Sequence, residues 1–149
     1  MKIGLDIHGV LDHHPERFIK IALENWDAFE WGLHAEREDN NRNNYVNYII
    51  TGPTKEKALI ELQALADKYN NGAPFWDEIY SIVDYIKEYN VPYTVNDKGQ
   101  IWALHEDDWN KIKGILAHKL ELDIHYDDSL CYEKYFPAGV FCYVVRRKE

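Results

Sequence analysis

The chain has few cysteines and no long apolar stretch, and each absence argues against a class of protein. Cys131 and Cys142 are the only cysteines in the sequence, and their spacing fits no common metal site. We therefore expect both thiols to be reduced, as is usual in the cytoplasm. No apolar run approaches the roughly 20 residues needed to span a membrane. The N-terminal sequence "MKIGLDIHG" lacks the apolar core of a signal peptide, so the sequence predicts a cytoplasmic protein without membrane association.

The chain also lacks a basic surface. Its 26 acidic residues outnumber 17 lysines and arginines, which gives a net charge of −9, and no Lys/Arg cluster offers a local exception. Such a surface repels a nucleic-acid backbone, so we do not expect nucleic acid as a partner. A small anionic substrate remains compatible with this charge if a bound cation neutralises it.

Length and apolar periodicity predict the fold. A chain of 149 residues suits a single domain, 1–149, with a sizeable core. Short apolar runs predict strands at 2–5, 45–50, 122–126 and 139–145. Helical spacing predicts helices at 14–26, 58–69, 76–89 and 109–120, and a hairpin is expected around the turn "NDKG" at 96–99. This alternation favours an α/β fold, a Rossmann-like three-layer sandwich with a mostly parallel sheet. The polar segment 28–44 is expected to form a small lid or a long connection.

Polar residues follow three of the predicted strands. In open α/β sheets, ligands bind outside the carboxyl ends of the strands, so these residues are the candidates for a site. A single strand-ending aspartate is often only a helix cap or a turn residue. Three strands that end in this way are harder to attribute to chance. The residues are Asp6, His8 and Gly9 after the first strand, Thr51 and Gly52 after the second, and Asp127, Asp128 and Ser129 after the predicted strand at 122–126.

The segments "LDIHGVLD", "YIITG", "WNKIKGILAHK" and "IHYDDS" together resemble the motifs of the haloacid dehalogenase-like (HAD-like) hydrolases. Members of that family, mostly Mg²⁺-dependent phosphatases, have an Asp-x-Asp-Gly motif, then a Thr or Ser, then a Lys before an acidic pair. The resemblance extends from residue 2 to about residue 145. It implies a phosphatase with a small or absent cap that acts on a small phosphorylated substrate, with nucleotides among the candidates.

The resemblance also implies roles for the residues. Asp6 would be the nucleophile and form an aspartyl-phosphate, which divides hydrolysis into two easier steps. Mg²⁺ would bridge the two anions and be held by carboxylates and by the backbone carbonyl of His8. The carboxylates would be Asp6, Asp127 and Asp128, and the substrate phosphate would be held by Gly9, Thr51, Gly52 and a lysine.

The sequence leaves several lysines as candidates for that role. Lys111, Lys113 and Lys119 lie on one predicted helix, and Lys98 lies in the hairpin turn. We favour Lys113, because it borders the apolar face of its helix and its long stem can extend along that face. The other three are expected to be solvated.

His8 is the departure from the family pattern, because it stands where most of these phosphatases have a second Asp. An imidazole can act as general acid and base near neutral pH, so His8 is a candidate for that role. The alternative is a catalytically weakened or inactive relative, a regulatory protein that binds phosphate and metal. A third hypothesis, a plain α/β domain with chance strand-ending acids, predicts no stabilisation by Mg²⁺.

Two other groups of residues have more than one interpretation. Asp12 is expected to cap the following helix or to face the substrate entrance. The tryptophans are expected to pack in the core or in a lid, with an aromatic clamp on a nucleobase as the alternative. They are Trp26, Trp31, Trp76, Trp102 and Trp109.

Overall fold

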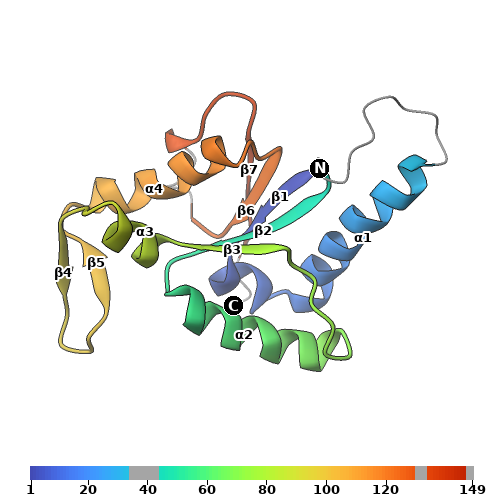
Figure 1. Ribbon diagram of the computed structural model, residues 1–149, viewed down its shortest axis with the longest axis horizontal. Coiled ribbons are helices and arrows are strands. Elements are labelled where there is room, and N and C mark those ends of the chain that lie inside the picture. The colour runs from blue at the N-terminus through green and yellow to red at the C-terminus, as the bar shows by residue number, and fades with distance from the viewer. Residues whose placement is uncertain (34–43, 130–133, 147–149) are drawn as a thin grey trace.

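A computed structural model describes residues 1–33, 44–129 and 134–146, with the backbone alone for 29–33. In this part of the chain, five strands form a parallel sheet in the order β3-β2-β1-β6-β7, with β1 at its centre (Figure 1). The strands are β1 (Lys2–Leu5), β2 (Val46–Thr51), β3 (Glu78–Ser81), β6 (Ile124–Asp127) and β7 (Phe141–Val144).

Helices cover both faces of the sheet, and this confirms the predicted Rossmann-like three-layer sandwich. Apolar residues of α1 (Pro15–Leu33) and α2 (Lys55–Tyr69) form one core cluster with the sheet. Residues of α3 (Ile82–Glu88) and α4 (Glu106–Lys119) form the other. Ile49 and Ile50 are consecutive in β2 but belong to different clusters, because successive side chains of a strand point to opposite faces.

The predicted hairpin is present as β4 (Tyr93–Val95) and β5 (Ile101–Ala103), which pair antiparallel. The side chain of Asn96 holds the turn, because its Oδ1 accepts from the backbone N–H groups of Lys98 and Gln100, both at 2.9 Å. Figure 1 shows the hairpin next to α3 and the start of α4, on the side of the molecule to which β2 and β3 run.

The predicted helix at 76–89 is wrong in its first half. Residues Glu78–Ser81 form strand β3, which pairs parallel with β2, and only Ile82–Glu88 is helical. The apolar residues of the strand and of the helix happen to continue one helical spacing. The boundary is set at Ser81, whose hydroxyl accepts from the backbone N–H of Asp84 at 3.1 Å and so caps α3.

The other bounds differ less from the prediction. α1 continues through residue 33, so the first residues of the segment 28–44 are helical, while 34–43 lie outside the described residues, as does Cys131. The last strand is shorter than predicted and lies at the edge of the sheet, where Phe141 is 62% exposed. None of the described helices is long and apolar enough to cross a membrane.

Candidate functional site

Asp6 lies at the carboxyl end of the central strand, where its backbone N–H donates to the carbonyl of Tyr126 on β6 at 3.1 Å. Its carboxylate Oδ1 accepts from the N–H of Ile7 at 2.8 Å, and the residue is only 6% exposed. The chain therefore buries a carboxylate at this edge and fixes its orientation with a backbone donor.

The loop after Asp6 turns at Gly9. A short irregular helical turn spans Ile7–Leu11, and Gly9 has φ of 86°, a conformation that favours glycine. A Cβ on Gly9 would overlap the carboxylate of Asp128, so a larger residue would separate the loop from β6. The N–H of Gly9 donates to Asp12 Oδ1 at 2.7 Å. Asp12 therefore holds this turn, whereas α1 begins only at Pro15, so its predicted role as the cap of α1 is wrong.

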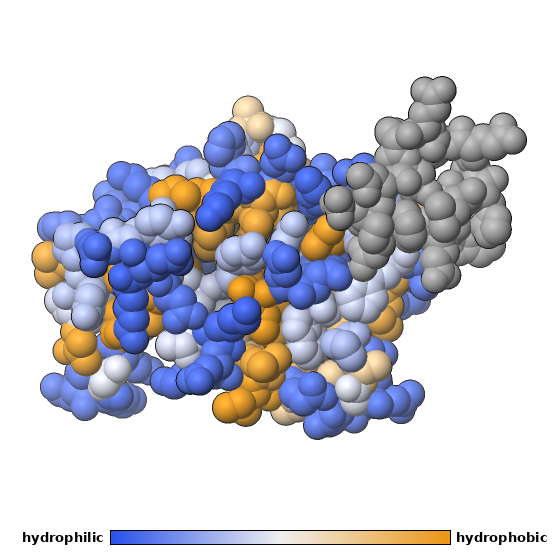
Figure 2. All heavy atoms as spheres, viewed as in Figure 1, coloured by the Kyte–Doolittle hydropathy of each residue, from blue (hydrophilic) through white to orange (hydrophobic). Residues whose placement is uncertain are grey.

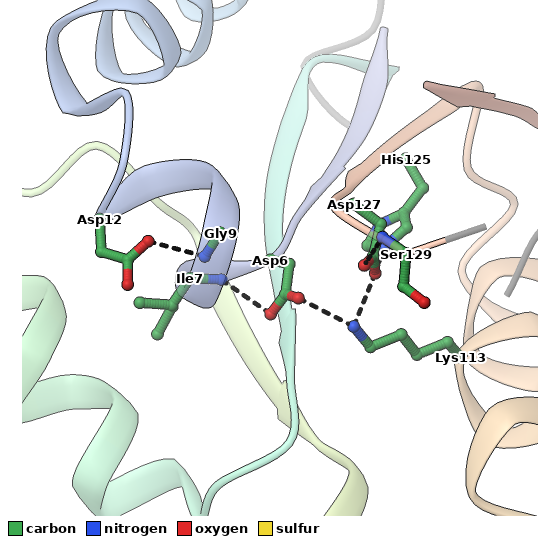
Figure 3. Close-up of polar contacts among 8 residues, drawn as sticks. All are labelled: Asp6, Ile7, Gly9, Asp12, Lys113, His125, Asp127 and Ser129. Atoms are coloured by element: carbon green, nitrogen blue, oxygen red, sulfur yellow. Dashed lines mark hydrogen bonds and ion pairs between the residues drawn. The ribbon is translucent and has the colours of Figure 1, made fainter. Parts of the chain in front are cut away.

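Figure 3 shows the ammonium of Lys113 between the carboxylates of Asp6 and Asp127 at this edge, and the carboxylate of Asp128 lies close to both. One oxygen from each of Asp6, Asp127 and Asp128 lies within 4.8 Å of the other two. Lys113, on α4, places its Nζ 3.1 Å from Asp6 Oδ2 and 2.6 Å from Asp127 Oδ2. Lys113 is 2% exposed and Asp127 is fully buried, so water screens these charges weakly.

Burial and neighbouring charges shift the two buried carboxyl groups in opposite directions. Burial raises the pKa of Asp6, and the charge of Asp127 adds to the rise, although Lys113 opposes it. Burial would also raise the pKa of Asp127, but Lys113 and a hydrogen bond from His125 outweigh that effect and hold it well below its usual range. Asp127 is therefore held as the ion that pairs with Lys113, whereas the charge on Asp6 is less fully compensated.

His125 lies on β6, two residues before Asp127, and contacts the carboxylate of Asp127. The sequence interpretation did not include this histidine in the site. Its Nε2 lies 2.9 Å from Asp127 Oδ2, and its Nδ1 has no hydrogen-bond partner in the described part of the chain. Gly4 is its register partner on β1, and a Cβ there would lie 2.5 Å from Nδ1, so glycine leaves room for the imidazole. Side chains two apart on a strand share a face, so the pair His125 and Asp127 was readable from sequence.

His8 does not join the buried group. Its side chain is 48% exposed, and its Nε2 lies 2.7 Å from Glu61 Oε2 on α2. His8, the predicted general acid, is thus two residues from Asp6 in the sequence, but its side chain contacts the carboxylate of Glu61 on α2. Glu61 was missed because only the packing of α2 beside the loop after β1 brings it to His8.

Thr51 and Gly52 end β2 at the same edge. Thr51 Oγ1 is buried and has no hydrogen-bond partner among the described residues. A buried hydroxyl without a partner is costly, and a ligand oxygen is one group that would satisfy it. The carbonyl of Gly52 accepts from the N–H of Val83 at 3.1 Å, which ties the loop to α3. The other candidate lysines, Lys98, Lys111 and Lys119, are exposed.

The carboxylates are suitable ligands for a divalent cation. Mg²⁺ prefers oxygen ligands at 2.0–2.1 Å, so opposite ligands lie roughly 4 Å apart, close to the 4.8 Å within which the three oxygens lie. One ammonium against three carboxylates leaves negative charge at the site, which a cation would balance. The residues present therefore fit Mg²⁺.

Comparison of the chain with protein-family models, with curated proteins and with solved structures finds no match.

Proposed function

We propose that the chain is a HAD-like, Mg²⁺-dependent phosphomonoester hydrolase that acts through an aspartyl-phosphate on Asp6. The observation that carries the proposal is the buried contact of Lys113 with both Asp6 and Asp127 at the carboxyl edge of the sheet. A carboxylate and a phosphate repel each other. An ammonium beside the nucleophile offsets that repulsion and stabilises the charge of the transferred group.

In the first step, the Asp6 carboxylate attacks phosphorus and the ester P–O bond breaks. The leaving oxygen takes a proton from the His8 imidazolium. In the second step, water attacks the phosphorus of the aspartyl-phosphate and gives its proton to His8, which releases inorganic phosphate and restores Asp6. The contact of His8 Nε2 with Glu61 Oε2 at 2.7 Å would fix the orientation of the imidazole in these steps.

The remaining residues hold the phosphate and the cation. Thr51 Oγ1 would donate to a phosphate oxygen, and the two loops that contain Gly9 and Gly52 would let the backbone approach it. Asp6, Asp128 and the carbonyl of His8 would ligate Mg²⁺. Asp127 would act directly or through water, since one of its oxygens already contacts Lys113 and His125. A bound cation would offset part of the charge of the nucleophile and the phosphate.

The test is Mg²⁺-dependent hydrolysis of p-nitrophenyl phosphate by the wild type, by Asp6→Asn and by Asp123→Asn. Asp123 precedes β6 at the opposite edge of the sheet, where its carboxylate accepts from the N–H of Lys2, so it is a matched control. The proposal predicts release that needs Mg²⁺, that chelator and Asp6→Asn abolish, and that Asp123→Asn retains. Equal release by the wild type and Asp6→Asn would contradict it.

A second candidate function is a non-catalytic protein that binds phosphate and metal at the same site. The half-exposed His8, held by Glu61 outside the buried group, favours it. The substitution His8→Asp separates the two candidates. If the wild type is inactive and His8→Asp gains Mg²⁺-dependent turnover, the binding protein is supported. If the wild type is active and His8→Ala is slowed by the roughly 10²–10⁴-fold typical of a lost acid/base group, the hydrolase is supported.

A further inference from the structure

A tryptophan of α4 lies directly beside the proposed phosphate loop. Trp109 packs so close to Gly52 that a Cβ on the glycine would lie 3.1 Å from Cζ2 of the indole. Trp109 precedes Lys113 by four residues, so the two side chains share one face of α4, one turn apart. Lys113 reaches Asp6 at one end of this face, and Trp109 borders Gly52 at the other.

A second tryptophan, Trp102 on β5, extends this aromatic surface toward solvent. The ring centroids of Trp102 and Trp109 are 4.7 Å apart with 36° between the ring planes. Trp102 is 47% exposed, whereas its neighbours Ile101 and Ala103 pack against the core cluster of α3 and α4. The hairpin is therefore anchored by its inward side chains and holds the Trp102 ring against a fixed support.

We propose that Trp102, supported by Trp109, stacks on the base of a nucleoside 5′-monophosphate whose phosphate lies at Thr51 and Lys113. This placement of the phosphate rests on the proposed function. A large indole that is half-exposed on a rigid support offers a planar apolar face at low entropic cost, and bases stack on such faces. Figure 2 shows hydrophobic residues exposed among hydrophilic ones at the end of the molecule that carries the hairpin, and the exposed aliphatic residues of this part of the chain include Val95 and Leu104.

The separation along α4 favours a nucleotide over a simple aryl phosphate. Four residues of helix rise about 6 Å, so Trp109 lies one turn from the lysine that contacts Asp6. The ring of an aryl phosphate is bonded directly to the phosphate oxygen and would stay near Lys113. In a nucleotide the ribose separates the base from the phosphate and spans this turn. The net charge of −9 disfavours a nucleic-acid polymer, which leaves the mononucleotide.

The test compares adenosine 5′-monophosphate with ribose 5-phosphate, which has the same sugar and phosphate but no base. Dissociation constants are measured by calorimetry with Mg²⁺ in the Asp6→Asn protein, alone and combined with Trp102→Ala, Trp102→Phe or Tyr93→Ala. Tyr93 is the matched control, because it is an aromatic residue of the same hairpin, 48% exposed, whose register partner is Ala103 rather than Trp102.

We expect the mononucleotide to bind more tightly than ribose 5-phosphate. Trp102→Ala should weaken binding of the mononucleotide by roughly 5-fold to 150-fold, the range of one base–aromatic stack, and leave binding of ribose 5-phosphate unchanged. Trp102→Phe should retain most of the affinity, and Tyr93→Ala all of it. Equal affinity for the two ligands, no binding of either, or a loss in Trp102→Ala that is the same for both would overturn the inference.

These outcomes are distinct from failure of the proposed function. Mononucleotide binding that depends on Trp102, without phosphate release from any ester by the wild type, would reject the hydrolase and leave the base site standing. The opposite result is Mg²⁺-dependent hydrolysis of p-nitrophenyl phosphate together with mononucleotide binding that does not depend on Trp102. It would support the hydrolase and reject the base site.

Discussion

The ammonium of Lys113 lies 2.6 Å from the carboxylate of Asp127, and both groups are buried. Taking two charges out of water is costly, and their attraction repays that cost only when the geometry is close and further hydrogen bonds are made. Here His125 and the N–H of Ser129 complete the bonding of Asp127. The pair places a positive charge beside the candidate nucleophile Asp6. Loss of either partner would leave the other as an unpaired buried charge, so the stability of the fold depends on both.

The first prediction concerns removal of that charge. Lys113→Met should lower the free energy of unfolding at pH 7 by about 3–5 kcal/mol, because it leaves buried carboxylates without a cation. The pKa of Asp127 is lowered in the folded state, so its ionisation contributes stability above the usual carboxyl range, and that contribution is lost as pH falls. The deficit of Lys113→Met should therefore be largest at neutral pH and shrink below about pH 4.

Urea unfolding at pH 7 and at about pH 2.5, where the contribution of Asp127 is being lost, measures this deficit, and Lys111→Met is the control. Lys111 lies on the same helix but is exposed, so its replacement should change the free energy of unfolding by about 0.5 kcal/mol or less. Equal effects of the two substitutions at pH 7 would show that the buried contact is unimportant for stability.

The second prediction concerns the charge of Asp6 itself. Burial raises the pKa of Asp6 in the folded state, so stability that is present at low pH is lost as pH rises through the folded pKa. Asparagine has the shape of the aspartate side chain and no charge to lose. In chelator, Asp6→Asn should therefore be more stable than the wild type at pH 7, and the difference should vanish near pH 4. Thermal melting across this range is the measurement, and a less stable variant at pH 7 would count against a costly ionised Asp6.

The third prediction couples Gly4 to His125. A Cβ on Gly4 would lie 2.5 Å from His125 Nδ1 and 2.7 Å from Leu122 Cδ1, so Gly4→Ala should cost about 1–3 kcal/mol of unfolding free energy. In a His125→Ala background the larger clash is gone, and the same substitution should cost clearly less. A double-mutant cycle in urea tests this coupling. Additive effects of the two substitutions would mean that glycine is not there to make room for the imidazole.

Much of this architecture was predictable from local sequence. The predicted strands at 2–5 and 122–126 are short runs that are followed by an acid, and β1 (Lys2–Leu5) and β6 (Ile124–Asp127) form at these places and position Asp6 and Asp127. Strand β3 was not recognised, because its apolar residues continue the helical spacing of α3. Ser81, three residues before Asp84, is a helix-start signal that would have placed the boundary.

The composition of the site was predictable only in part. Lys113 was favoured because it borders an apolar helix face, and the structure brings it to Asp6 and Asp127. The contact of His8 with Glu61 depends on how α2 packs, and no local pattern carries that information. The same holds for Trp102 and Trp109, whose contact forms only when the hairpin folds onto α4.

The fourth prediction separates a cation site from chance acids. If Mg²⁺ binds at Asp6, Asp127 and Asp128, it should raise the free energy of unfolding of the wild type by about 2.7 kcal/mol at a concentration of 100 times the dissociation constant, and the melting temperature should rise with it. Asp128→Asn removes one of the proposed ligands and should reduce this shift, whereas Asp123→Asn should leave it unchanged. No rise in the wild type at millimolar Mg²⁺ would favour the plain α/β domain.

The most direct test of the proposed nucleophile is to trap the phosphoryl group on Asp6. Wild-type protein is mixed with Mg²⁺ and excess p-nitrophenyl phosphate, quenched in acid within the first turnovers, digested and analysed by mass spectrometry. The proposed mechanism predicts a phosphoryl adduct on the peptide that contains Asp6, lost on mild alkaline treatment and missing from Asp6→Asn. Phosphate release without any adduct, and at the same rate in Asp6→Asn, would contradict it.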